Sequence, residues 1–215
     1  MKLVLAPLIL LTTWVHADVV IEQKLESALM NGNMTMKIKG DQARMDMPAS
    51  AAGEMSVIMD LKSGEMSTLI HGQKMAMKMK LDAAKKQAEA AQKQQGLDLS
   101  KIEKPKATGK TEKIGEWEAE IFETNLSGTP AKFWVAKDFP NYKSINEQMK
   151  KLSAASGSMG FDPNNFDLGG MVVKSEMNTP AGKVTSTVVK AKEEPVDAAV
   201  FVMPAGYKEM AFPGQ

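Results

Sequence analysis

Three methionines alternate along one short stretch of the chain, at Met75, Met77 and Met79. Thioethers are soft ligands, and methionines separated by one residue form a pattern that can capture Cu(I) or Ag(I). The same alternation is typical of a β-strand, in which every second side chain lies on the same face. The stretch therefore indicates either a soft-metal site or the apolar face of a strand.

Other residue types that carry chemistry are scarce. The chain has no cysteine, which excludes thiol catalysis and cysteine-ligated zinc or iron–sulfur clusters. Its histidines are His16 and His71, which is too few for a zinc site built from histidines. We expect His71 to lie solvated in a turn. Because no phosphate-binding loop, nucleophile-elbow or zinc-protease motif is present, we predict no catalytic residues, no metal site, no cofactor and no enzymatic activity.

The first residues have the layout of a secretory signal peptide. Lys2 precedes an apolar run over residues 3–11, and the segment ends with a small residue at Ala17. We predict cleavage after Ala17, a single domain over residues 18–215, and a periplasmic or secreted protein without a membrane span. Removal of residues 1–17 leaves 26 basic and 26 acidic side chains. This balance gives no field that would attract nucleic acid.

Short stretches with strict apolar–polar alternation dominate the chain. Such alternation predicts strands that are buried on one face and wet on the other. Turns containing glycine separate them, which favours an antiparallel meander. We predict eight to ten strands, drawn from stretches near residues 19–27, 34–39, 43–47, 55–61, 66–70, 75–79, 110–124, 131–138, 170–178 and 183–194.

Two segments have helical patterns. The first is rich in alanine, lysine and glutamine and runs from an N-cap candidate, Asp82, to Gly96. The second, over residues 144–156, carries an apolar stripe with Ile145 and Leu152. Residues 157–170, rich in glycine, proline and asparagine, are expected to form a loop. The predicted fold is α+β: one curled antiparallel sheet, an open or half β-barrel with its polar face outward, whose concave face is covered by two or three helices.

Four stretches of the chain carry a resemblance to a known family: VIMDLKSGEM, GKTEKIGEWEAEIFE, KFWVAKD and FVMPAGYKEM. They resemble an exported bacterial family of unknown function, family 4412. The family is distantly similar to the half-barrel fold of the lipoprotein carriers LolA and LolB. The resemblance implies an open barrel wrapped on helices, with an apolar interior suited to an acyl chain. It implies no known activity.

Methionines recur on the predicted strands and on the second helix, where they would share the concave side of the sheet. The candidate ligand-contacting residues are Met34, Met36, Met45, Met47, Met59, Met75, Met77, Met79 and Met149. Methionine is flexible and polarisable, which suits an adaptable apolar surface. We predict a monomeric, non-catalytic protein that binds an apolar ligand (a lipid or acyl chain) or a partner segment. The alternatives are a Cu(I)/Ag(I)-binding protein and a structural or interaction module, with methionines that only fill a core.

Overall fold

The structure is a computed structural model that describes residues 17–28, 30–50, 53–94, 102–126, 128–156, 166–179 and 182–211. The predicted signal peptide, except for Ala17, and most of the predicted loop 157–170 lie outside these residues. The elements are β1 (Val19–Glu26), β2 (Asn31–Lys39), β3 (Gln42–Ser50), β4 (Gly53–Asp60), β5 (Glu65–Ile70), η1 (His71–Gln73), β6 (Met75–Lys80), α1 (Leu81–Gln94), β7 (Lys106–Ile114), β8 (Trp117–Leu126), β9 (Thr129–Ala136), α2 (Tyr142–Ser156), β10 (Met171–Thr179), β11 (Gly182–Glu193), η4 (Ala198–Phe201) and β12 (Lys208–Ala211).

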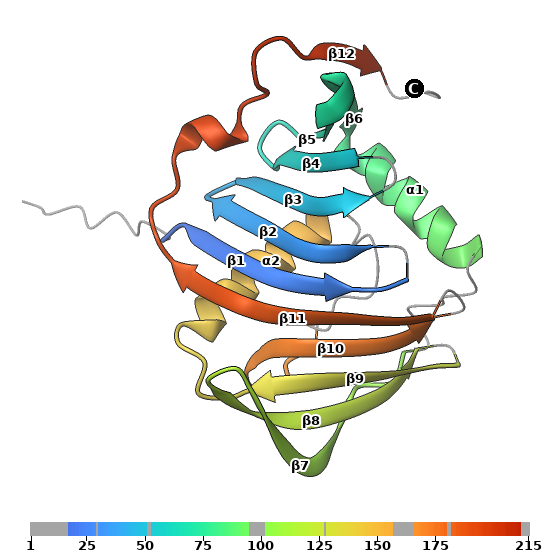
Figure 1. Cartoon of the computed structure of the whole chain (residues 1–215), viewed down its shortest axis with the longest axis vertical. Helices are drawn as coiled ribbons and strands as arrows, with labels where there is room; N and C mark the ends of the chain where they lie inside the picture. Colours follow the sequence, from blue (N-terminus) through green and yellow to red (C-terminus); the bar gives the residue numbers. More distant parts are fainter. Residues whose placement is uncertain are drawn as a thin grey trace, which may run out of the picture.

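All of these strands belong to one curled sheet, shown in Figure 1. The strand order is β12-β6-β5-β4-β3-β2-β1-β11-β10-β9-β8-β7. The prediction of a single large curled sheet is therefore confirmed, although its twelve described strands exceed the expected eight to ten. One reason is a turn at Gly115, which adopts a positive φ of 60° and divides the stretch expected as one strand into β7 and β8. Glycine adopts this conformation without steric cost.

The sheet is antiparallel except at one edge. β12 pairs with β6 in parallel, which corrects the expectation of a purely antiparallel sheet. The chain leaves β11 near the middle of the sheet and crosses to the far edge through η4, as Figure 1 shows. We call residues 194–207 the C-terminal strap. Because the strap crosses the sheet before β12 begins, β12 reaches the edge in the same direction as β6.

The main core lies between the concave face of the sheet and the two helices. Leu81 and Ala84 of α1, and Ile145 and Leu152 of α2, are buried in one apolar cluster with residues of the sheet. Both predicted helices are present, and they are the α-helices of the described residues. Asp82 was expected as an N-cap but lies inside the first turn of α1. The helix begins one residue earlier because Leu81 continues directly from β6.

The outer face of the sheet is less polar than predicted. The C-terminal strap covers one part of it, where Phe201 and Val196 are buried against Ile58 and Leu69. A second cluster, around Phe133, lies under the segment that contains Leu168. These segments bury apolar side chains of the outer face that would otherwise be exposed to water.

Candidate functional site

The strand register arranges the concave face over β2 to β6 into three rows of side chains. Directly paired residues of neighbouring strands have their Cβ atoms about 4.5–5.5 Å apart. The inner row is Ile38, Ala43, Met59, Met66 and Met79. The middle row is Met36, Met45, Val57, Thr68 and Met77. The outer row is Met47, Met55, Ile70 and Met75.

Burial decreases from the inner row to the outer row. Every member of the inner row is buried, with exposed fractions between 0% and 7%. The helix residues of the main core share its apolar cluster. In the middle row Met36 and Val57 are buried, whereas Met45, Thr68 and Met77 are half-buried. All four members of the outer row are half-buried. The outer part of the face is thus apolar surface that the described residues cover only in part.

The predicted candidate residues divide along this gradient. Met36, Met59 and Met79 belong to the core. The half-buried candidates on the sheet are Met34, Met45, Met47, Met75 and Met77. Met149 of α2 packs against the same cluster and is also half-buried. Met55 and Met66 lie on the same face and were not among the candidates, although the alternation of β4 and β5 carries the same signal for them. A ligand-binding role for these residues stays a prediction.

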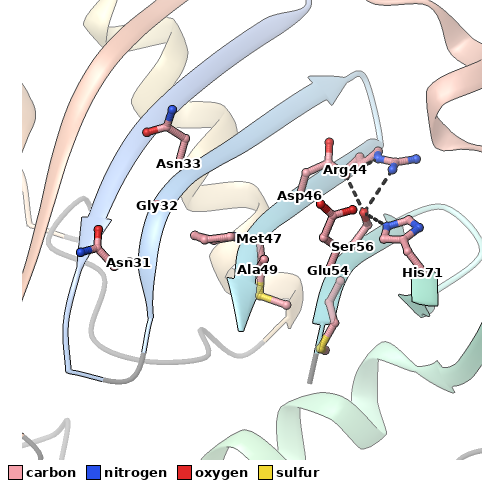
Figure 2. A pocket seen from close by; sticks show the side chains of 12 residues that line it. Asn31, Gly32, Asn33, Arg44, Asp46, Met47, Ala49, Glu54, Ser56 and His71 are labelled. Atoms are coloured by element: carbon pink, nitrogen blue, oxygen red, sulfur yellow. Dashed lines mark hydrogen bonds and ion pairs between the residues drawn. The ribbon is translucent and has the colours of Figure 1, made fainter. Parts of the chain in front are cut away.

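A polar cluster lies on the opposite face of the same strands. Arg44 and Asp46 alternate with Met45 and Met47 along β3, so their side chains lie on the other side of the sheet. Arg44 Nε donates to Asp46 Oδ1 at 2.7 Å, and Ser56 Oγ donates to the same oxygen at 2.6 Å. Arg44 Nη2 donates to Ser56 Oγ at 3.1 Å. Figure 2 shows these side chains together with His71.

His71 has hydrogen-bond partners at both ring nitrogens. Its Nε2 lies 2.6 Å from Ser56 Oγ, and its Nδ1 lies 2.5 Å from Tyr207 Oη in the C-terminal strap. The expectation of a solvated turn residue was therefore wrong. Nothing near His71 in the sequence indicates this contact, because Ser56 and Tyr207 are 15 and 136 positions away.

The contact between Ser56 and His71 is not arranged as a nucleophile and its base. The single hydroxyl proton of Ser56 is donated to Asp46, so Ser56 Oγ accepts from His71 Nε2. The Ser56 side chain is also buried, with an exposed fraction of 1%. Burial raises the pKa of Asp46, but hydrogen bonds from Ser56 and Arg44 outweigh it and hold this pKa below its usual value. The cluster is thus an ionised, hydrogen-bonded network beneath the strap.

An open pocket of about 590 Å³ lies beside this network and is lined by residues of β2, β3, β4 and η1. The ladder between β2 and β3 ends at the pair Thr35 and Asp46. Pro48 follows, and proline has no N–H with which to continue a ladder. The lining includes polar residues such as Asn33 and His71, and also Met47 and Met55 of the outer row. Residues of the polar cluster and of the methionine-lined face therefore both border the pocket.

Comparison with known proteins places the chain in a family. The model of the Domain of unknown function (DUF4412) matches residues 20–207. The chain belongs to the DUF4412 family. This confirms the family resemblance seen in the sequence. No curated protein matches the chain in sequence.

Solved structures share the general course of the DUF4412 chain at low sequence identity. The lipoprotein LppX of Mycobacterium tuberculosis is 12% identical with a TM-score of 0.48, over 84% of this chain and 88% of LppX. LprF of Mycobacterium bovis is 12% identical with a TM-score of 0.39, over 89% of this chain and 90% of LprF. PNGF-II is 13% identical with a TM-score of 0.43, over 91% of this chain but only 31% of PNGF-II. None of these three TM-scores reaches 0.5.

Two further observations concern metal ligands and membrane-spanning helices. The described residues include no group of three or more histidine, aspartate or glutamate side chains that could hold a metal ion. Among the same residues, no helix combines the length and apolar character needed to cross a membrane.

Proposed function

We propose that this DUF4412 protein is an exported, non-catalytic protein that binds a lipid or acyl chain on its concave face. The binding surface consists of the outer row and the half-buried members of the middle row. The observation that carries this proposal is the decrease in burial across one continuous methionine-lined face. The inner row packs with the helices in the main core, and the outer row has apolar side chains that are still accessible.

The chemistry of these side chains suits an acyl chain. Burying a methylene group is worth about 0.8 kcal/mol, so several methylenes against the outer row offset the cost of association. Methionine has three rotatable bonds and no branched carbon, so the surface adapts to chains of different length. A ligand would contact Met47, Met75 and Met77, which are half-buried, rather than the tightly packed inner row.

The structure offers less support for a copper site. Thioether sites for Cu(I) gain affinity from a nitrogen ligand close by. His71 is the only histidine beyond the predicted signal peptide. Both of its nitrogens are engaged by Ser56 and Tyr207 on the opposite face of the sheet. The methionine rows would have to bind the metal with sulfur alone.

A fluorescent fatty-acid probe tests the acyl-chain proposal. We expect saturable binding to the exported protein after removal of co-purified lipid, and at least tenfold weaker binding to Met77→Asp. Binding of the probe's acyl chain would remove water from the new carboxylate at position 77, and this loss of hydration is unfavourable. Because Met77 is half-buried, the carboxylate can stay hydrated in the empty protein. Met36→Asp is unsuitable, because Met36 lies in the core.

The matched control is Ser67→Asp. Ser67 lies on β5 beside the same strand, and its side chain is on the opposite face, paired with Lys78. We expect it to leave probe binding unchanged, with both variants folded by circular dichroism. If the folded wild-type protein shows no saturable binding, or if the two variants weaken binding equally, the proposed function is wrong.

A further inference from the structure

The pocket lined by β2, β3, β4 and η1 has two chemically different groups of lining residues. Its apolar wall is formed by Met47 and Met55, which belong to the outer row. Its polar wall is formed by Asn31, Asn33 and Glu54, together with the polar cluster. A molecule seated here would contact both walls at once. This is the arrangement that an amphiphile requires, with a polar end and an apolar end.

The charged lining residues of the pocket are Arg44, Asp46 and Glu54, one positive and two negative. Arg44 and Asp46 form an ion pair, so their charges cancel. Glu54 lines the pocket with an exposed carboxylate. Lys37 pairs with Arg44 across the strands, and its positive charge is close enough to help lower the pKa of Asp46. Lys37 is not among the lining residues, and the register places it level with Ile58, four residues from Glu54 along β4. The lining therefore keeps the negative charge of Glu54, which disfavours an anion.

Hydrogen-bonding groups remain available on the polar wall. The amides of Asn31 and Asn33 each provide donors and an acceptor, and the carboxylate of Glu54 provides acceptors. All three side chains are exposed. Hydroxyl groups both donate and accept, so they match a wall that mixes the two. A wall of neutral amides beside one carboxylate fits a neutral ligand with several hydroxyl groups better than a phosphate or a carboxylate.

We propose that this pocket binds a neutral, hydroxyl-rich group, such as a sugar ring or a polyol, as the polar end of an amphiphile. The pocket volume of about 590 Å³ lies within the range of about 300–1,000 Å³ usual for small-molecule sites. It leaves room for a sugar ring and the first methylenes of a chain. The direction of the chain, over Met47 and Met55 toward the outer row, rests on the proposed function. The recognition of the hydroxyl-rich group does not.

The test uses n-octyl β-D-glucoside below its critical micelle concentration and the exported protein. His71 lines the pocket and is the only histidine of residues 18–215, so its ring protons are a unique NMR reporter. We expect these resonances to shift with saturable dependence on the glucoside. In the double variant Asn31→Ala, Asn33→Ala the dissociation constant should rise about tenfold, because hydrogen bonds to the hydroxyl groups are lost.

Two comparisons make the outcome decisive. Asn178→Ala, at an exposed asparagine of β10, is the matched control and should leave glucoside binding unchanged. The fluorescent fatty acid, which has no sugar, should bind the wild type and the double variant equally. The pocket proposal fails if the glucoside leaves the His71 resonances unmoved, or if the double variant binds the glucoside as tightly as the wild type does. If the fatty acid still binds in either case, the proposed function stands. If the glucoside behaves as expected and the fatty acid does not bind, the proposed function fails and the pocket proposal stands. If neither binds, both fail.

Discussion

Replacing Met66 by alanine is expected to lower the free energy of unfolding by about 2–4 kcal/mol, as for other buried methionines truncated in a core. Met66 belongs to the inner row, paired with Met59 on one side and Met79 on the other. It is buried in the cluster that also holds Leu81 and Ile145. The truncation leaves a cavity between the sheet and the helices. Urea denaturation followed by circular dichroism measures the change.

Met75→Ala is the matched control for this prediction. Met75 lies on the same face, on β6, in the outer row, and it is half-buried. We expect it to cost less than about 1 kcal/mol, because less apolar area is removed from contact and the site can be filled by water. Equal losses for the two variants would contradict the decrease in burial from the inner row to the outer row. They would also remove the basis of the proposed binding surface.

The difference between these rows bears on how one face can serve two purposes. Methionines of the inner row are buried in one apolar cluster with residues of α1 and α2, so they help to hold the helices against the sheet. Those of the outer row contribute less to stability and are therefore available to contact another molecule. The same residue type on the same strand, such as Met79 and Met75 of β6, then has a structural role at one end and a proposed binding role at the other.

Much of this face could be predicted from the sequence, because one-sided burial gives a strand a period of two. The alternation over residues 75–79 was enough to predict that Met75, Met77 and Met79 share a face. It could not show which of them would be buried, since burial depends on where the helices pack. The paired residues of the rows also required the register, which depends on turns and bulges along the whole meander.

The features that sequence reasoning missed depend on contacts between distant segments. β12 has four residues, Lys208–Ala211, too few to show a periodic pattern, and its partner β6 lies far away in the sequence. Ser56 looked like an ordinary polar residue of a strand, and its role appears only where His71 and Arg44 meet it. The end of the ladder before Pro48 was open to prediction, because proline limits pairing. That a pocket forms there depends on residues of three strands, β2, β3 and β4, and on His71 of η1.

Replacing Arg44 by methionine is expected to lower the free energy of unfolding by about 2–3 kcal/mol at pH 7, because a partly buried charge loses its partner. The exposed fractions of the Arg44 and Asp46 side chains are 16% and 34%. Arg44 Nη1 also donates to the carbonyl oxygen of Val200 in the C-terminal strap, at 3.0 Å. The variant thus weakens the strap as well as the ion pair. Lys78→Met, which removes an exposed pair with Glu209, is the control and should cost less than about 1 kcal/mol.

The effect of Arg44→Met should depend on pH in a direction that follows from Asp46. In the native protein the pKa of Asp46 is held below its usual value by Ser56 and Arg44, against the opposing effect of burial. A carboxyl whose pKa is lowered on folding contributes stability above its unfolded pKa of about 3.9, and this contribution is lost as the pH falls through the folded pKa. Without Arg44 the folded pKa of Asp46 rises, so the variant has little of this contribution to lose. The gap between wild type and variant should therefore be widest at pH 7 and narrower at pH 3, as measured by urea denaturation at both values. A gap that is equal at the two pH values would mean that Arg44 acts through packing and its bond to the strap, and not through the charge of Asp46.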